Sequence, residues 1–144
     1  MDIHSIRGRL WLCIPVIITD ILDATVTMLG QSAEYWKGSY HLVNEANPIA
    51  RWFLEIHPLA NGIYIVLDFV IISVLIIILP LFFSKILSAY WTVGSVKAIY
   101  GWSINRLGLG WWKSNLITLI PIIIFVYAFD KAVKHEANED EFPS

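Results

Sequence analysis

The sequence is poor in charged residues and contains a single cysteine. Charged side chains make up 15% of its 144 residues, against about 25% in typical soluble domains. The net charge of −2 is too small to attract nucleic acid, so we expect no nucleic-acid partner. Cys13 has no second cysteine for an internal disulfide, and its place in an apolar stretch indicates a small buried side chain.

Motifs of known chemistry are also missing. The sequence contains no His-Glu-x-x-His metal motif and no Gly-x-Ser-x-Gly nucleophile elbow. Catalytic residues, metal ligands and cofactors therefore stay unassigned, and we expect a protein that is not an enzyme. A membrane-embedded metal-dependent enzyme is a distant alternative, because carboxylates together with His41 and His57 could ligate a divalent ion.

What the sequence does have is long apolar runs. Hydrophobic residues make up 57% of the chain, and a membrane-spanning helix needs about 20 of them in succession. The pattern predicts an all-α polytopic membrane bundle in one domain, residues 1–130, with four transmembrane helices at about 10–30, 60–83, 86–105 and 113–130. The third span carries Lys97 and could instead lie in the interface. We favour spanning, because Gly94, Ala98 and Gly101 offer a small face for helix packing.

The loop between the first two spans is predicted to contain a short interfacial helix at about 48–57. Asn47 is a typical N-cap residue, and Pro48 suits the first helical position. An apolar face and a charged pair follow at helical spacing: Ile49, Trp52, Phe53 and Ile56 on one side, Arg51 with Glu55 on the other.

The ends of the chain and its basic residues bear on topology. The polar, acidic tail at 131–144 is expected to fray. Five lysine or arginine residues flank the spans on the side of the termini and four on the opposite side. Because basic residues favour the cytoplasmic side, we expect a multi-pass protein of the cell membrane with both termini in the cytoplasm.

Four ionisable residues lie inside the predicted spans. Such charges cost about 2.5–3.5 kcal/mol each on insertion scales, and they usually face partners within a bundle. Aligned at their outer helix ends, Asp20, Asp68 and Lys97 lie roughly 12–15 Å deep, at one level. We therefore predict a buried polar cluster that continues to the outer rim: Asp20, Asp23, Thr27, Asp68 and Lys97 in the membrane, and His41, Glu45, Asn47, His57 and Asn105 at the rim.

Different functions fit such a cluster. Buried Asp and Lys contacts could hold the helices together in a structural or assembly subunit of a larger membrane complex, which is the interpretation we place first. The same residues, Asp20, Asp23, Asp68 and Lys97, could instead form a proton- or cation-coupled binding or transport site. The expected partners are the lipid bilayer and either other membrane subunits or further copies of the chain.

Two short motifs carry a resemblance to a known family. The first span contains Asp-Ile-Leu-Asp-Ala-Thr from Asp20 to Thr25, and the loop contains Glu-Ala-Asn-Pro from Glu45 to Pro48. This order resembles a domain-of-unknown-function family of small prokaryotic multi-span membrane proteins. The resemblance covers about the first 105 residues, so the fourth span and the tail would be additions. It implies an architecture and a polar cluster, and no reaction.

Overall fold

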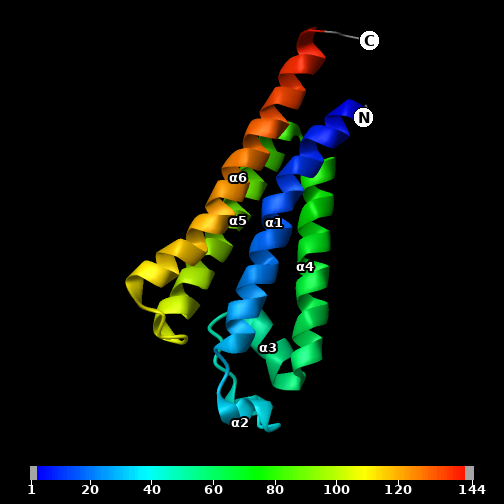
Figure 1. Cartoon of the computed structure of the whole chain (residues 1–144). Coiled ribbons are helices and arrows are strands. Elements are labelled where there is room, and N and C mark those ends of the chain that lie inside the picture. Colours follow the sequence, from blue (N-terminus) through cyan, green and yellow to red (C-terminus); the bar gives the residue numbers. More distant parts are fainter. Residues whose placement is uncertain (1–2, 142–144) are drawn as a thin grey trace.

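The chain folds into four long helices with a small helical cap at one end of the bundle. The computed structural model describes residues 3–141, and side chains of residues 6–135. All elements in that range are helical: α1 (Ile3–Leu29), α2 (Ala33–Trp36), the 3-10 turn η1 (Tyr40–Leu42), α3 (Pro48–Ile56), α4 (Pro58–Ile78), α5 (Leu81–Asn105) and α6 (Gly110–Glu141). Both termini lie at one end, and residues 31–57, here called the cap, lie at the opposite end (Figure 1).

Three of the helices are long and apolar enough to cross a membrane: Ile6–Leu29, Pro58–Ile78 and Gly110–His135. The chain is therefore a membrane protein. Helix α5 is as long as these, with 25 residues, but it is not among them. Its two lysines and its row of hydroxyl side chains make it more polar than the other three.

The hydroxyl side chains of α5 face the inside of the bundle. They recur at intervals of three, four or eight residues, which places them on one helix face. The Oγ of Ser84 donates a hydrogen bond of 2.7 Å to the carbonyl of Ile76, and the Oγ of Ser88 one of 2.7 Å to the carbonyl of Leu12. Small side chains let α5 pack closely against both α1 and α6. The buried members of this row are Ser84, Ser88, Thr92, Ser95 and Ser103.

A tight turn joins α4 to α5. Helix α4 ends at Ile78 and Pro80 is the N-cap of α5, so the predicted second span, drawn to residue 83, is too long. The guanidinium of Arg9 donates from Nη1 to the carbonyls of Ile77 and Leu79. It thereby caps the carbonyl end of α4, where acceptors lack helical partners and the helix dipole is negative.

Helices α4 and α5 separate beyond this turn. Helix α4 packs mainly on α1 and α3 and only lightly on α5, whereas α5 packs on α1 and α6. In Figure 1, α1 lies between α4 on one side and α5 with α6 on the other. The two helices that are neighbours in sequence are therefore held apart by α1 towards the cap.

The tail differs from the expectation. Helix α6 continues to Glu141, so the segment predicted to fray from residue 131 is helical to residue 141, and residues 142–144 lie outside the described part of the chain. Ala132 is buried against the bundle core, and Lys134 pairs with Asp130 at 2.7 Å. Burial and this i, i+4 pair explain why the helix outlasts its apolar sequence.

Candidate functional site

A polar cavity of about 320 Å³ lies where α4 and α5 diverge. Helix α1 forms its floor, α4 and α5 form its walls, and the cap borders it at the end away from the termini, with the loop at 45–47 and Ala50 of α3. Four carboxylic acids line it, from three different segments: Asp20, Asp23, Glu45 and Asp68. The sequence-predicted acids of α1 and α4 are thus brought together with Glu45 of the predicted rim.

Asp20 is the most firmly held of these acids. Its side chain is only 8% exposed. The indole Nε1 of Trp91 donates to both carboxylate oxygens, at 3.0 and 3.3 Å, and the Oγ of Ser95 donates to Oδ1 at 3.2 Å. Trp91 and Ser95 lie one turn apart on α5, so this carboxylate joins α1 to α5 in a fixed position.

Two other oxygens in the cavity wall have no partner. Oδ1 of Asp23 and Oδ1 of Asn61 are buried and accept no hydrogen bond from any described residue. Asn61 is only 3% exposed, and its amide nitrogen makes a single 3.8 Å contact with the sulfur of Met28. Buried oxygens of this kind are nearly always satisfied in native proteins. Both are acceptors, so they suit a ligand that carries N–H or O–H donors.

Lys97 does not join this cluster. The sequence predicts that it lies in the buried polar cluster with the acids, but the structure places it on the exposed side of α5, where it forms no ion pair with a described residue. Helix geometry gives the reason. Ser95 faces Asp20, and a residue two positions further along a helix points about 200° away from it. The cavity therefore holds acids without a basic side chain among its lining residues.

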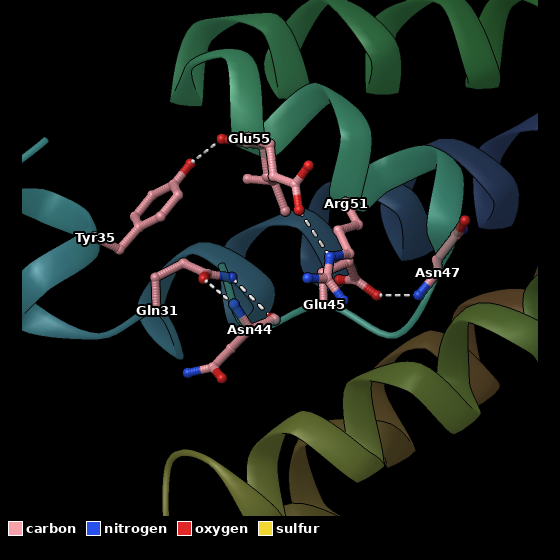
Figure 2. A network of polar contacts seen from close by, with 8 residues as sticks. Gln31, Tyr35, Asn44, Glu45, Asn47, Arg51 and Glu55 are labelled. Carbon is pink, nitrogen blue, oxygen red and sulfur yellow. Dashed lines mark hydrogen bonds and ion pairs between the residues drawn. The ribbon is translucent and has the colours of Figure 1, made fainter. Parts of the chain in front are cut away.

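The Glu-x-Asn-Pro segment builds the rim of the cavity. One carboxylate oxygen of Glu45 accepts a 2.7 Å hydrogen bond from the backbone N–H of Asn47. The side chain of Asn47 accepts bonds from the N–H groups of Ile49 and Ala50, at 3.0 and 3.4 Å, and so caps α3 as predicted. Figure 2 shows the bond between Glu45 and Asn47. The motif starts a helix and, in doing so, turns Glu45 towards the cavity.

Two side chains that sequence reasoning missed hold the cap in place. Gln31 pairs with the backbone of Asn44 in both directions, accepting from its N–H at 2.8 Å and donating to its carbonyl at 3.0 Å (Figure 2). The hydroxyl of Tyr35 donates to the carbonyl of Leu54 at 3.1 Å. Burial, together with neighbouring Tyr40, raises the pKa of Tyr35. No local pattern marks these residues, because each bond joins positions 13 or more apart.

Aromatic rings complete the cavity wall. Tyr64, Tyr90, Trp91 and Trp102 line it, and the ring of Phe53 stacks on Tyr64 with centroids 5.1 Å apart, which joins α3 to α4. Faces of such rings attract cations.

The remaining residues of the predicted cluster lie in different places. Thr27 is buried and lines the cavity. His41 and His57 are exposed and line neither cavity, and His57 instead accepts a 3.1 Å bond from the N–H of Leu59 as a helix cap. Within the described residues, no group of three His, Cys, Asp or Glu side chains could hold a metal ion. The metal hypothesis thus gains no geometric support.

A second, wider groove adjoins the cavity at the cap. It measures about 850 Å³ and lies between the loop at 43–47 with α3 and the last two turns of α5. Arg51, Asn105 and Arg106 line it, and it shares four lining residues with the cavity: Glu45, Asn47, Ala98 and Trp102. The two spaces are therefore continuous: three aspartates line only the cavity, two arginines line only the groove, and Glu45 lines both.

Comparison with known proteins identifies no relative: no family model matches the chain, and neither a curated protein nor a solved structure is similar to it.

Proposed function

We propose that this protein binds a small organic cation, carrying an ammonium group, in the cavity between α1, α4 and α5. The observation that carries the proposal is the set of four acids, Asp20, Asp23, Glu45 and Asp68, around one cavity whose lining contains no lysine or arginine. Carboxylates that lie close together in a poorly hydrated space repel one another, and a bound cation relieves this repulsion. This proposal takes up the cation site that the sequence offers as an alternative function. It replaces the structural or assembly subunit, which the sequence places first.

The geometry favours an organic cation over a metal ion. A metal needs three or more ligands at one point, and the described acids, histidines and cysteine do not converge in that way. An alkylammonium group needs less precise geometry, because it can combine carboxylates, aromatic faces and lone acceptors. The unpartnered oxygens of Asp23 and Asn61 supply such acceptors, and a volume of about 320 Å³ lies at the lower end of the range of small-molecule pockets.

The proposal includes a membrane arrangement of four spans with α3 in the interface. Helix α5 packs on α1 and α6, so its hydroxyl face is buried. Its outer face exposes Phe82, Ile86 and Val93, which suit lipid, together with Lys97. The apolar side chains of α3 point outward, with Ile49 58%, Trp52 59% and Ile56 52% exposed, as expected of an amphipathic helix at a membrane surface. With the termini in the cytoplasm, as the basic residues predict, the cavity opens in the outer half of the cell membrane.

Calorimetric titration of the purified protein in maltoside detergent tests the binding proposal. We expect ethanolamine or choline to bind, and Asp20→Asn to weaken binding about tenfold or more, since a hydrogen-bonded charge contributes roughly 1.5–3 kcal/mol. Asparagine keeps the shape and the acceptor for Trp91. The control is Asp130→Asn, an exposed acid on α6 outside the cavity. The proposal would be overturned if neither amine bound, or if Asp20→Asn and Asp130→Asn weakened binding equally.

Lys97 favours a second candidate, in which the chain associates with another membrane subunit or with a second copy. An ammonium group exposed on the outer face of α5, eight residues from the helix end, is costly against lipid and favours a covering partner. Analytical ultracentrifugation in mild detergent should show an assembly that Lys97→Met weakens and that Lys113→Met, at the start of α6, leaves intact. A monomer in all three samples would remove this candidate.

A further inference from the structure

The structure assigns the ligand a second charge: we infer that the cation carries an anionic group, such as a phosphate, which Arg106 and Arg51 hold in the groove beside the cavity. This inference rests on the proposed cation site and names its substrate class. It follows from the groove that continues the cavity and from the donors along its walls.

The cavity and the groove form one space whose two ends carry opposite charges. Glu45, Asn47, Ala98 and Trp102 line both parts, so a ligand in the cavity has a direct way into the groove. The cavity end presents three aspartates, the groove end presents two guanidinium groups, and the carboxylate of Glu45 lines both parts. A ligand with one charge would satisfy one end only, whereas a zwitterion of the right length satisfies both.

Both arginines have donors to spare. Arg51 uses its Nε to reach Glu55 at 2.8 Å, which leaves its four terminal N–H groups outside that bond (Figure 2). The guanidinium of Arg106 forms no hydrogen bond or ion pair with any residue in the described part of the chain. Its backbone is fixed by a 3.0 Å bond from its N–H to the carbonyl of Trp102 at the end of α5. Guanidinium groups bind phosphate through paired hydrogen bonds, so this end suits a phosphate better than a weakly basic anion.

Other side chains of the groove fit the same ligand. The amide side chain of Asn105 can donate to phosphate oxygens from the same wall as Arg106. Trp102 lies between the two ends and offers an aromatic face to the linker of the ligand. An ammonium joined to a phosphate occurs in zwitterionic phospholipid headgroups and in free phosphorylated amino alcohols, and both carry the chemistry that this space would recognise.

Binding of matched probes to the purified protein in maltoside detergent tests the inference. Choline and ethanolamine probe the cation end alone, phosphocholine and phosphoethanolamine probe both ends, and inorganic phosphate probes the outer end alone. We expect each phosphorylated probe to bind about tenfold or more tightly than its parent amine. Arg106→Gln should remove most of that gain and leave the affinity for the parent amine unchanged. Arg7→Gln, an exposed residue that lines neither space, should change neither affinity.

The outcomes separate this inference from the proposed function. If an amine binds and its phosphorylated form binds no better, the second charge is wrong and the cation site stands. If Arg106→Gln weakens both probes equally, the arginine supports the fold only and the inference fails. If inorganic phosphate binds as tightly as phosphocholine, the groove is an anion site unrelated to the cavity, which also overturns it. If neither amine binds, the proposed function fails, and this inference fails with it.

A further arm distinguishes the two sources of the zwitterion. Dihexanoylphosphatidylcholine, kept below its micelle concentration, carries the same headgroup as phosphocholine with two short acyl chains. Tighter binding than phosphocholine assigns the ligand to a lipid that enters between α4 and α5, and equal binding assigns it to a free headgroup. Either result supports the zwitterion, whereas loss of binding of both compounds in the unmodified protein contradicts it.

Discussion

The half of the bundle near the termini and the half near the cap are built from the same long helices, but they differ in how tightly these helices pack. Near the termini, Leu12, Val16 and Ile76 are completely buried in one apolar cluster. Near the cap, the corresponding helices part around acids and unpartnered oxygens, and the apolar cluster there is small, with Tyr35, Val43 and Leu54 as its buried members. The comparison indicates that the terminal half holds the fold together, whereas the cap half contains the cavity in which we propose that a ligand binds.

The difference begins at the turn between α4 and α5. Because this turn is tight, the two helices must touch near the termini, where Ser84 bonds to Ile76 across it. Towards the cap they are held apart by α1, and polar and aromatic side chains line the space between them. Close packing at one end therefore creates the cavity at the other.

Among the variants that test this comparison, Leu12→Ala in the terminal half is expected to lower the free energy of unfolding the most. Removing a fully buried leucine side chain leaves a void and costs about 2–5 kcal/mol of the free energy of unfolding. Unfolding in denaturant, monitored by circular dichroism in detergent, measures the loss. Leu67→Ala is the control, because Leu67 is 51% exposed on α4. Equal losses in both variants would show that the terminal half is not the stable one.

A smaller loss is expected where α1 meets α5 at the cap. A Cβ on Gly30 would lie 2.5 Å from a ring carbon of Trp102 and 3.2 Å from Cβ of Arg106. Gly30→Ala should therefore cost about 1–3 kcal/mol by overpacking, and it should weaken binding of choline because Trp102 must move. Gly62→Ala, whose added Cβ meets nothing within 4 Å, provides the matched comparison. Unchanged choline binding in Gly30→Ala would show that Trp102 is not part of the binding site.

A third change tests the attachment of the cap. Tyr35→Phe removes the donor to the carbonyl of Leu54 and should cost about 1–3 kcal/mol. The pKa of Tyr35 is raised in the folded state, so the unfolded chain loses this proton first and stability falls as the pH rises above about 10. Unfolding measured from pH 8 to 11 should show a steeper decline in the unmodified protein than in Tyr35→Phe. Identical slopes would contradict the role of this hydroxyl.

The smallest effect is also the most informative about the division between stability and binding. Asp23→Asn keeps the shape of the side chain and removes one charge from the crowded acids. We expect the free energy of unfolding to stay equal or to rise by up to about 1 kcal/mol, as is common when a functional site is relaxed, while amine binding weakens. A loss of stability in this variant, measured beside Asp130→Asn, would mean that Asp23 supports the fold.

The features that depend on residue spacing along one helix could be predicted from the sequence. The cap of α3 at Asn47 and the Arg51–Glu55 pair follow from spacing along one helix, and the structure confirms both. The shared depth of Asp20 and Asp68 follows from counting residues along two spans, and both line one cavity. Each of these inferences needs only helix geometry and the identity of the residue.

The parts that were missed depend on rotation and on long-range contacts. Depth along a helix says nothing about the face on which a residue lies, so Lys97 was placed at the right level and on the wrong side. Ser88 and Arg9 bond to backbone carbonyls 76 and 68 or more positions away, and no periodicity within one helix reveals such a partner. The cavity itself depends on how far α1 holds α4 and α5 apart, which is a property of packing.

Thermal unfolding in the presence of an amine tests the central claim most directly. A ligand that binds only the folded protein raises Tm with its concentration. We expect ethanolamine or choline to raise the Tm of the unmodified protein and, by a similar increment, that of Leu12→Ala, whose defect lies in the terminal half. The double variant Asp20→Asn with Asp68→Asn should show no rise. An equal rise in the double variant, or none in the unmodified protein, would contradict the account.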